Sequence, residues 1–193
     1  YKYKVTVNGN SPCGSVDSTP SGGATLTVTL APVALATYAF EGVATATVPA
    51  NVTAAAVSSV GASAISYQGG TDGGGTQIGF NTTWPASATF NASTAQYLQF
   101  DLQANSTYEL TLSSASINLG RTATGPSNVT VQYSLDGFVT AGTTCLNNVT
   151  VSSTSTSALN TFALTSLPSG AFSSKITFRI WAYNSGGGNL RFN

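Results

Sequence analysis

The strongest constraint on the fold is a run of alternating side chains near the C-terminus, Lys-Ile-Thr-Phe-Arg-Ile-Trp-Ala-Tyr at residues 175–183. Apolar side chains occupy every second position of this run, at Ile176, Phe178, Ile180 and Ala182. Because successive side chains of a β-strand point to opposite faces, the pattern predicts a strand with one face packed inward. Such a strand requires a second apolar layer on its buried side.

Similar alternation recurs along the chain, in segments bounded by turn-forming residues. The clearest segments cover residues 97–102, 108–112, 115–119, 129–135, 149–151 and 162–164, and residues 1–8 and 24–30 alternate as well. Many short alternating segments joined by turns are typical of an antiparallel β-sandwich. No segment shows the 3.6-residue period of an amphipathic helix. We therefore predict an all-β fold, and the 193 residues are enough for one domain with an appendage.

The composition argues against several partners. Charged residues make up 6% of the chain, against roughly 25% in an average domain, and the net charge is zero. The basic residues are few and scattered, so the chain lacks the basic patch that nucleic-acid binding requires. No apolar run approaches the roughly 18 residues that indicate a membrane span. The chain begins with Tyr1, and we expect a processed form or part of a longer protein.

The sequence also argues against an enzyme. It contains no His, the commonest general base and transition-metal ligand. Its few carboxylates are dispersed, and none forms an evident pair of the kind that hydrolyses glycosides. We predict no catalytic residues and no organic cofactor.

Calcium is the metal that the dispersed acidic residues could bind, since it accepts carboxylate, carbonyl and amide oxygens. The weak candidates are Asp72, within a Gly-rich loop at residues 69–75, and Asp136, which precedes Gly137. The alternative is that both are turn residues without an ion. We favour this alternative, because calcium loops usually cluster several acids.

The two cysteines, Cys13 and Cys145, are too few for a four-ligand zinc site. The composition favours an extracellular or cell-surface location, where disulfides are permitted. Three arrangements stay open: a Cys13–Cys145 bridge within the chain, a bridge between subunits, and two free thiols.

Aromatic residues on the polar side of the C-terminal run suggest a sugar-binding surface. Trp181 and Tyr183 lie opposite the core positions, Arg179 is their polar neighbour, and Trp84 is a second, loop-borne aromatic. Rings exposed on a strand can stack against pyranose rings. The alternative, which we favour, is burial of Trp181 and Tyr183 under the N-terminal segment or a neighbouring subunit, because a sandwich strand has only one face in its own core.

A resemblance to a known family rests on a set of short motifs. They are Tyr-Ala-Phe-Glu-Gly at 38–42, Tyr-Leu-Gln-Phe at 97–100, Arg-Thr-Ala-Thr-Gly-Pro-Ser at 121–127, Tyr-Ser-Leu-Asp-Gly-Phe at 133–138, Phe-Arg-Ile-Trp-Ala-Tyr-Asn at 178–184 and Asn-Leu-Arg-Phe at 189–192. Together they resemble secreted bacterial domains that are common in large surface and exported proteins of Bacteroidota. The resemblance implies a jelly-roll β-sandwich, similar in shape to carbohydrate-binding modules and without catalytic residues. It divides the chain into an N-terminal β-extension, residues 1–37, and a sandwich domain, residues 38–193.

Glycosylation motifs are frequent in a chain this rich in Asn, Ser and Thr, where chance alone produces several. Sequons of the form Asn-x-Ser/Thr occur at Asn51, Asn81, Asn91, Asn105, Asn128 and Asn148. The short motif Asp17-Ser18-Thr19 also resembles the O-glycosylation motif of Bacteroidota, with Ser18 as the acceptor.

The N-terminal extension carries the functional prediction. A strand outside the domain core needs a partner, which is either its own sheet or the sheet of the next subunit. We expect a non-enzymatic extracellular structural subunit that assembles into a pilus-like filament or surface polymer by strand exchange through Tyr1, Tyr3, Val5 and Val7. The alternative is a carbohydrate-binding or adhesive module of a larger secreted protein. The expected partners are further copies of the chain and, in the alternative, a polysaccharide.

Overall fold

The computed structural model describes residues 34–40, 44–61, 65–72, 75–80, 83–153 and 159–192. The chain divides into two units, Tyr1–Val33 and Ala34–Asn193, and the fold presented here is that of the second unit. Several predicted site residues lie outside the described residues: Tyr1, Tyr3, Val5, Val7, Cys13, Ser18 and Asn81.

The described residues form eleven β-strands and no helix. The strands are β1 (Val52–Ala54), β2 (Ser58–Val60), β3 (Ile65–Asp72), β4 (Gly75–Phe80), β5 (Tyr97–Ala104), β6 (Ser116–Arg121), β7 (Asn128–Ser134), β8 (Thr143–Thr150), β9 (Asn160–Ala163), β10 (Ile176–Tyr183) and β11 (Leu190–Phe192). Among these residues there is accordingly no helix that could cross a membrane.

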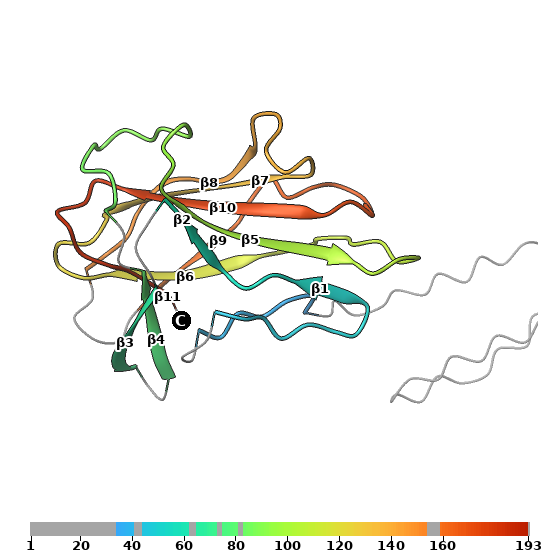
Figure 1. Ribbon diagram of the computed structural model, residues 1–193, viewed down its shortest axis with the longest axis horizontal. Helices are drawn as coiled ribbons and strands as arrows, with labels where there is room; N and C mark the ends of the chain where they lie inside the picture. The colour runs from blue at the N-terminus through green and yellow to red at the C-terminus, as the bar shows by residue number, and fades with distance from the viewer. Residues whose placement is uncertain are drawn as a thin grey trace, which may run out of the picture. The chain divides into compact units, whose positions relative to one another are not determined.

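The strands make two antiparallel sheets, and the all-β prediction is confirmed. The first sheet has the order β1-β5-β10-β7-β8, with β2 also paired to β5, and the second has the order β3-β4-β11-β6-β9. Figure 1 shows β10 between β5 and β7 in one layer, with β6 and β11 of the second sheet below them. This arrangement is consistent with a β-sandwich, whereas the jelly-roll connectivity stays a prediction.

The strand predicted from residues 175–183 is the central strand of the first sheet. In β10, Phe178 is in register with Phe100 of β5 and with Tyr133 of β7. The apolar side chains of β10 are almost fully buried, and the ring of Phe178 stacks on that of Phe100 at a centroid distance of 5.0 Å. Burial of each large apolar side chain contributes about 1.5–3 kcal/mol to stability.

The second sheet supplies the apolar layer that β10 requires. Phe80 of β4, Leu119 of β6 and Phe192 of β11 are each at most 1% exposed and belong to the same core. The rings of Phe80 and Phe192 meet edge to face, 5.2 Å apart. The core therefore lies between the two sheets, as the alternation of the strands predicts.

The segment 69–75, which we predicted to be a Gly-rich loop, belongs largely to strands β3 and β4. Strand β3 continues to Asp72, whose Cα pairs with that of Gly75 at the start of β4. The register shifts between Tyr67 and Thr71, where Gly69 and Gly70 lie. Glycine in a strand often marks such a bulge, because it has no side chain to pack.

A polar corner joins the end of β6 to the segment before β11. The Arg121 side chain donates to four carbonyls, with Nε 2.8 Å from Val151 O, Nη1 2.8 Å from Ala123 O, and longer Nη1 contacts to Thr122 O and Gly125 O. The Thr122 N–H donates to Asn189 O at 3.0 Å. Arg121 therefore satisfies backbone acceptors that a turn would otherwise leave without partners.

Candidate functional site

The outer face of β10 is covered by loops, which the sequence does not reveal. Trp181 and Tyr183 are each only 2% exposed, although they point away from the core between the sheets. The described cover comes from loop 83–96, between β4 and β5, and loop 135–142, between β7 and β8. In Figure 1 both loops rise on the side of the first sheet that faces away from β6.

The burial that we favoured for Trp181 and Tyr183 is confirmed, whereas the sugar-stacking alternative is wrong and the described cover differs from the one expected. Neither Trp181 nor Tyr183 is free to stack flat on a sugar ring, because other side chains already occupy the space above them. Their described cover is supplied by loops of the sandwich itself, so a neighbouring subunit is not needed to explain it. The rule that a sandwich strand buries only one face fails where long loops fold back over the sheet.

The side chains that cover Trp181 form an aromatic cluster, which we define as Phe90, Tyr97, Phe138, Trp181 and Tyr183. The rings of Phe90 and Phe138 meet the Trp181 ring edge to face, at centroid distances of 5.6 and 6.0 Å. Tyr97 lies 5.6 Å from Trp181, and Phe90 lies 6.0 Å from Tyr183. Such pairs contribute about 0.5–1.5 kcal/mol each beyond their buried area, so the cluster fixes both loops on the sheet.

Arg179 is enclosed by two rings and held by an amide. Its guanidinium carbon lies 4.3 Å from the Tyr97 ring centroid and 4.1 Å from that of Phe138. Its Nε donates to Gln99 Oε1 at 2.9 Å. Cation–π contacts of this kind stabilise by about 0.5–2 kcal/mol, so Arg179 braces the cluster.

A small hollow of about 110 Å³ opens beside the aromatic cluster, between loop 83–96 and β10. Strand β10 contributes Trp181, Ala182 and Tyr183. The loop contributes Pro85, Ser87, Thr89, Phe90, Asn91 and Thr94. None of these residues is charged, and the loop side combines one half-buried aromatic ring with exposed hydroxyl and amide groups.

The loop that forms the hollow is held near its start by the rest of the fold and farther along by a hydrogen bond of its own. Near its start, Trp84 is 4% exposed and its Nε1 donates to Phe80 O at 3.2 Å, so this predicted sugar-stacking residue is an anchor in the core instead. The backbone N–H of Asn184 donates to Ser87 O at 2.9 Å. Farther along, Asn91 Oδ1 accepts from the Ser93 N–H at 2.9 Å. The hollow is therefore largely pre-formed.

The indole nitrogen of Trp181 is the chemically distinctive atom of the site. Trp181 Nε1 is buried, and no described residue accepts a hydrogen bond from it. An indole N–H can only donate, and a buried donor left without a partner costs about 1–3 kcal/mol. The Trp181 ring is in contact with the rings of Phe90, Tyr97 and Phe138. None of these residues places an oxygen or nitrogen acceptor within hydrogen-bond distance of the indole N–H.

A polar network closes the other side of Tyr183. Its hydroxyl donates to Asn148 Oδ1 at 2.8 Å and lies 3.0 Å from Thr130 Oγ1. The same oxygen of Asn148 accepts from Asn128 Nδ2 at 2.9 Å. Tyr183 is therefore hydrogen-bonded within the protein.

The predicted N-glycosylation residues fall into different environments. Asn91, Asn105 and Asn148 are exposed, whereas Asn51 and Asn128 are half-buried. The Nδ2 atom, to which an N-glycan would be attached, already donates to Ala50 O in Asn105 and to Asn148 in Asn128. Attachment at either residue would leave this nitrogen a single hydrogen with which to keep its bond.

Cys145 carries a free thiol, so the Cys13–Cys145 bridge, one of the three arrangements left open by the sequence, is not formed in this structure. Its side chain is 1% exposed and belongs to the core, with Sγ 3.5 Å from Val131 O. Burial raises the pKa of the Cys145 thiol to about 12. A bridge to any partner would require this part of β8 to open.

The calcium candidates are not brought together with other acids. Asp136 accepts hydrogen bonds from the Ser134 hydroxyl and from the N–H and hydroxyl of Thr140, which is the turn role that Gly137 predicts. The Ser134 bond, followed by those from Thr140, lowers the pKa of Asp136 to about 2. Asp72 ends β3. Among the described residues, no group of three or more His, Cys, Asp or Glu side chains gathers.

Sequence reasoning missed Phe90 and Phe138, which make the site. Phe138 follows the Asp136-Gly137 turn, which the sequence identifies, but the turn does not reveal that the ring contacts Trp181. Phe90 lies among small and polar residues in loop 83–96, where no periodicity identifies it.

Comparisons with protein-family models, with curated proteins and with solved structures find no match to this chain. The likeness to secreted Bacteroidota domains therefore stays a prediction from sequence, and the function is argued from the site alone.

Proposed function

We propose that this chain is a non-enzymatic, exported binding module that holds a saccharide at the hollow beside Trp181. The observation that carries the proposal is the composition of that hollow, in which the half-buried Phe90 ring is surrounded by exposed Ser87, Thr89 and Asn91. Apolar surface with a few placed polar groups is the usual make-up of a small-molecule site. A pyranose offers the matching surface, an apolar face edged by hydroxyl groups.

The absence of charge in the hollow supports binding without turnover. No Asp, Glu, Lys or Arg lines it, and the sequence has no His. A glycosidase requires a pair of carboxylates on either side of the scissile bond. The hollow offers no such pair, whereas its hydroxyl and amide groups are suited to recognition.

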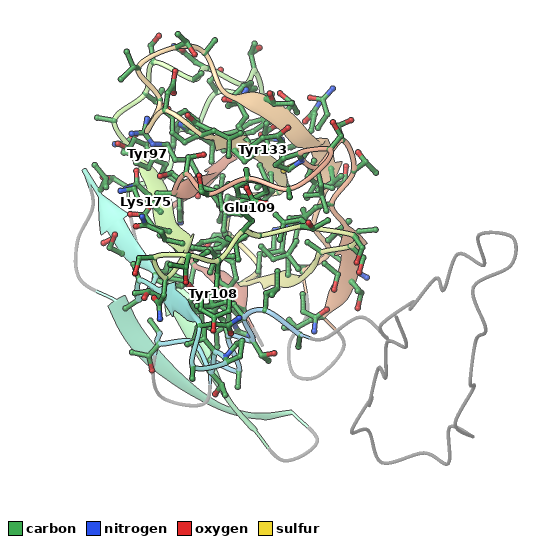
Figure 2. The ribbon with its side chains drawn as sticks, turned by 90° about the vertical axis from the view of Figure 1, so that its right-hand side faces the viewer. Tyr97, Tyr108, Glu109, Tyr133 and Lys175 are labelled. Carbon is green, nitrogen blue, oxygen red and sulfur yellow. The ribbon has the colours of Figure 1, made fainter. Side chains whose placement is uncertain are left out.

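Affinity electrophoresis through gels that contain soluble polysaccharides tests this proposal. We expect at least one neutral polysaccharide to retard the protein, and Phe90→Ala to weaken the apparent affinity at least tenfold, which corresponds to about 1.4 kcal/mol. Tyr108→Ala is the matched control, because Tyr108 is 52% exposed and lies well away from Tyr97 of the aromatic cluster (Figure 2). The proposal fails if no polysaccharide retards the protein, or if both variants lose affinity equally.

A second candidate function, assembly by strand exchange, is favoured by the outer edge of β8, with which no described strand pairs. This eight-residue strand ends the first sheet, and among the described residues no strand pairs with its outer edge. One acceptor of the strand, Cys145 O, is already taken by the Thr165 N–H at 2.8 Å, so an added strand would pair with the rest of the edge. An open strand edge is a template for an added strand, and the alternating residues Tyr1, Tyr3, Val5 and Val7 have the pattern of one.

Deletion of residues 1–8 tests the second candidate. A structural subunit should form polymers by light scattering, and the deletion should leave folded monomers. A full-length chain that is monomeric at high concentration would rule out self-assembly through these residues and leave the saccharide proposal untouched.

A further inference from the structure

We infer that Arg179 is a second binding point on the outer face of β10, and that it holds the carboxylate of an acidic saccharide. The inference rests on the proposed function and narrows it, since it names uronic-acid-containing saccharides as the class that this face binds. Its support comes from the surroundings of Arg179: the charge of its neighbours, the fixed position of its guanidinium, and the strained loop residue that encloses it.

Arg179 carries a charge that no described carboxylate neutralises. Its neighbours in register on the two adjacent strands are Gln99 of β5 and Gln132 of β7, and both are neutral. Lys175, in contrast, is paired with Asp101 at 3.0 Å, which is the one ion pair among the described residues. The charge of Arg179 is therefore available to an anion that comes from outside the fold.

The guanidinium of Arg179 is held in place before any ligand arrives. The ring centroids of Tyr97 and Phe138 lie 4.3 and 4.1 Å from its central carbon, and its Nε donates to Gln99 Oε1 at 2.9 Å. A mobile arginine side chain loses rotamer freedom when it binds a ligand. Much of that loss has already occurred in Arg179, so binding costs it less.

The two Nη nitrogens are the part of the guanidinium that a ligand can reach. Arg179 is half-buried, and neither Nη donates to a described residue. Neither is among the buried nitrogen and oxygen atoms that lack a partner, so both keep contact with solvent. A planar carboxylate can accept one hydrogen bond from each Nη, and bonds between two charged groups are the stronger ones. This end of the guanidinium therefore favours a carboxylate over a neutral sugar hydroxyl.

The backbone of Phe138 indicates that the enclosure of Arg179 is built into loop 135–142. Phe138 has φ of +66°, in the left-handed region that bulky residues rarely adopt. Gly137 before it has φ of +71°, and the Phe138 N–H donates to Ser134 Oγ at 2.9 Å. Residues held in such strained conformations cluster at binding sites. Here the strained conformation places the ring over the guanidinium.

Arg179 lies close enough to the hollow for one saccharide chain to reach both. Arg179 and Trp181 are two residues apart on the same face of β10, which separates their Cα atoms by about 7 Å. Tyr97 and Phe138 contact both side chains. A chain of a few sugar rings spans this separation, so a neutral ring at the hollow and an acidic ring beside Arg179 can belong to one ligand.

Calorimetric titration with acidic polysaccharides and with their carboxyl-reduced forms tests the inference. Glucuronoxylan and hyaluronate each combine neutral and uronic acid residues, and carboxyl reduction replaces every carboxylate with a neutral hydroxymethyl group. We expect the full chain to bind at least one of the two about tenfold more tightly than its reduced form, as suits a hydrogen-bonded pair of charged groups. Poly-L-glutamate, which carries carboxylates without sugar rings, should bind more weakly than that polysaccharide.

Variants of two basic residues assign the preference to Arg179. Arg179→Gln removes the charge and both Nη donors, and it should lose the preference for the acidic form. Lys175→Gln is the matched control, because it removes an equal charge just before β10 and should keep the preference. If Arg179→Gln does not fold by circular dichroism, Arg179→Lys takes its place. It keeps the charge without the paired donors and should lose most of the preference.

The outcomes distinguish this inference from the proposed function. A preference for the acidic form that is lost in Arg179→Gln and kept in Lys175→Gln supports both. Equal affinity for the acidic and reduced forms, a preference that both variants keep or both lose, or equally tight binding of poly-L-glutamate overturns the role of Arg179 and leaves saccharide binding at the hollow standing. Binding of neutral polysaccharides but of neither acidic one has the same consequence. Failure to bind any saccharide, in gels or in solution, overturns both.

Discussion

Substitution of Gly125 by Ala tests whether the corner between β6 and β11 has any spare room. Gly125 lies just after β6, where its N–H donates to Thr122 O at 2.9 Å. A Cβ atom added to Gly125 would lie 2.3 Å from Asn189 O and 3.1 Å from the Cβ of Arg121. Backbone atoms on the opposing segment leave no flexible side chain that could move aside.

The loss of stability in Gly125→Ala can be estimated from these distances. Real Cβ contacts do not fall below 3.0 Å, so Asn189 would have to move by most of an ångström. Asn189 accepts from Thr122 N at 3.0 Å, and its own N–H donates to Thr122 Oγ1 at 2.8 Å. Overpacking costs about 1–3 kcal/mol, and each hydrogen bond stretched out of range costs about 1 kcal/mol. We expect Gly125→Ala to lower the free energy of unfolding by about 3–5 kcal/mol.

Urea unfolding, followed by the fluorescence of the buried Trp84 and Trp181, measures this loss. The matched control is Gly137→Ala, because Gly137 has φ of +71° and nothing lies within 4 Å of an added Cβ. There only the left-handed backbone opposes the substitution, at about 1–2 kcal/mol. The reasoning is refuted if Gly125→Ala unfolds at the same urea concentration as Gly137→Ala or at a higher one.

Three further predictions concern single side chains. Burial raises the pKa of the Cys145 thiol to about 12 from its ordinary value near 9.0. Because the thiol of the unfolded chain ionises first, the free energy of unfolding should fall as the pH rises between these two values. The fall should be smaller in Cys145→Ala. The pKa of Asp136 is lowered to about 2 from 3.8, chiefly by the hydrogen bond from the Ser134 hydroxyl. The stabilisation by the ionised carboxylate should therefore be present above pH 4 and be lost as the pH falls toward 2, which a pH series of thermal midpoints measures. In Asp136→Asn this contribution to the pH dependence should be absent. Tyr183→Phe removes the hydrogen bond to Asn148 and should lower the urea-derived free energy of unfolding by about 1–2 kcal/mol.

The fold could be predicted because its strands carry their own pattern. The alternation at 175–183 corresponds almost residue for residue to β10, at Ile176–Tyr183. The same period identified β5 and β7, since one face of each strand packs on the core. The pairing order of the strands does not follow from such patterns, because the period says which face is buried and not which neighbour is beside it.

The candidate site could be predicted only in part. Trp181 and Tyr183 were identified as unusual for an outer face, and the structure shows that both are buried. What covers them depends on Phe90 and Phe138, which come from loops about 43 to 91 residues away along the chain, as their numbers show. Long-range loop packing has no local period, so sequence reasoning assigned the cover to the wrong partner.

The motifs behind the family resemblance lie partly at the corner of the sandwich and partly at the site, since the motif at 178–184 contains Trp181 and Tyr183. Arg121 donates to Ala123 O in its own turn and to Val151 O. Gly125 has no side chain, and so the backbone at Asn189 can pass close to it. These positions fix the corner of the sandwich and say little about a ligand. The hollow is built on the loop side from residues 85–94, which none of these motifs includes. Ser185 links this loop to the corner, since its N–H donates to Pro85 O at 3.1 Å and its hydroxyl donates to Thr124 O at 3.4 Å. Changes within loop 83–96 can therefore alter the lining of the hollow while the sandwich stays the same, and a resemblance that does not include this loop indicates the fold without indicating a ligand.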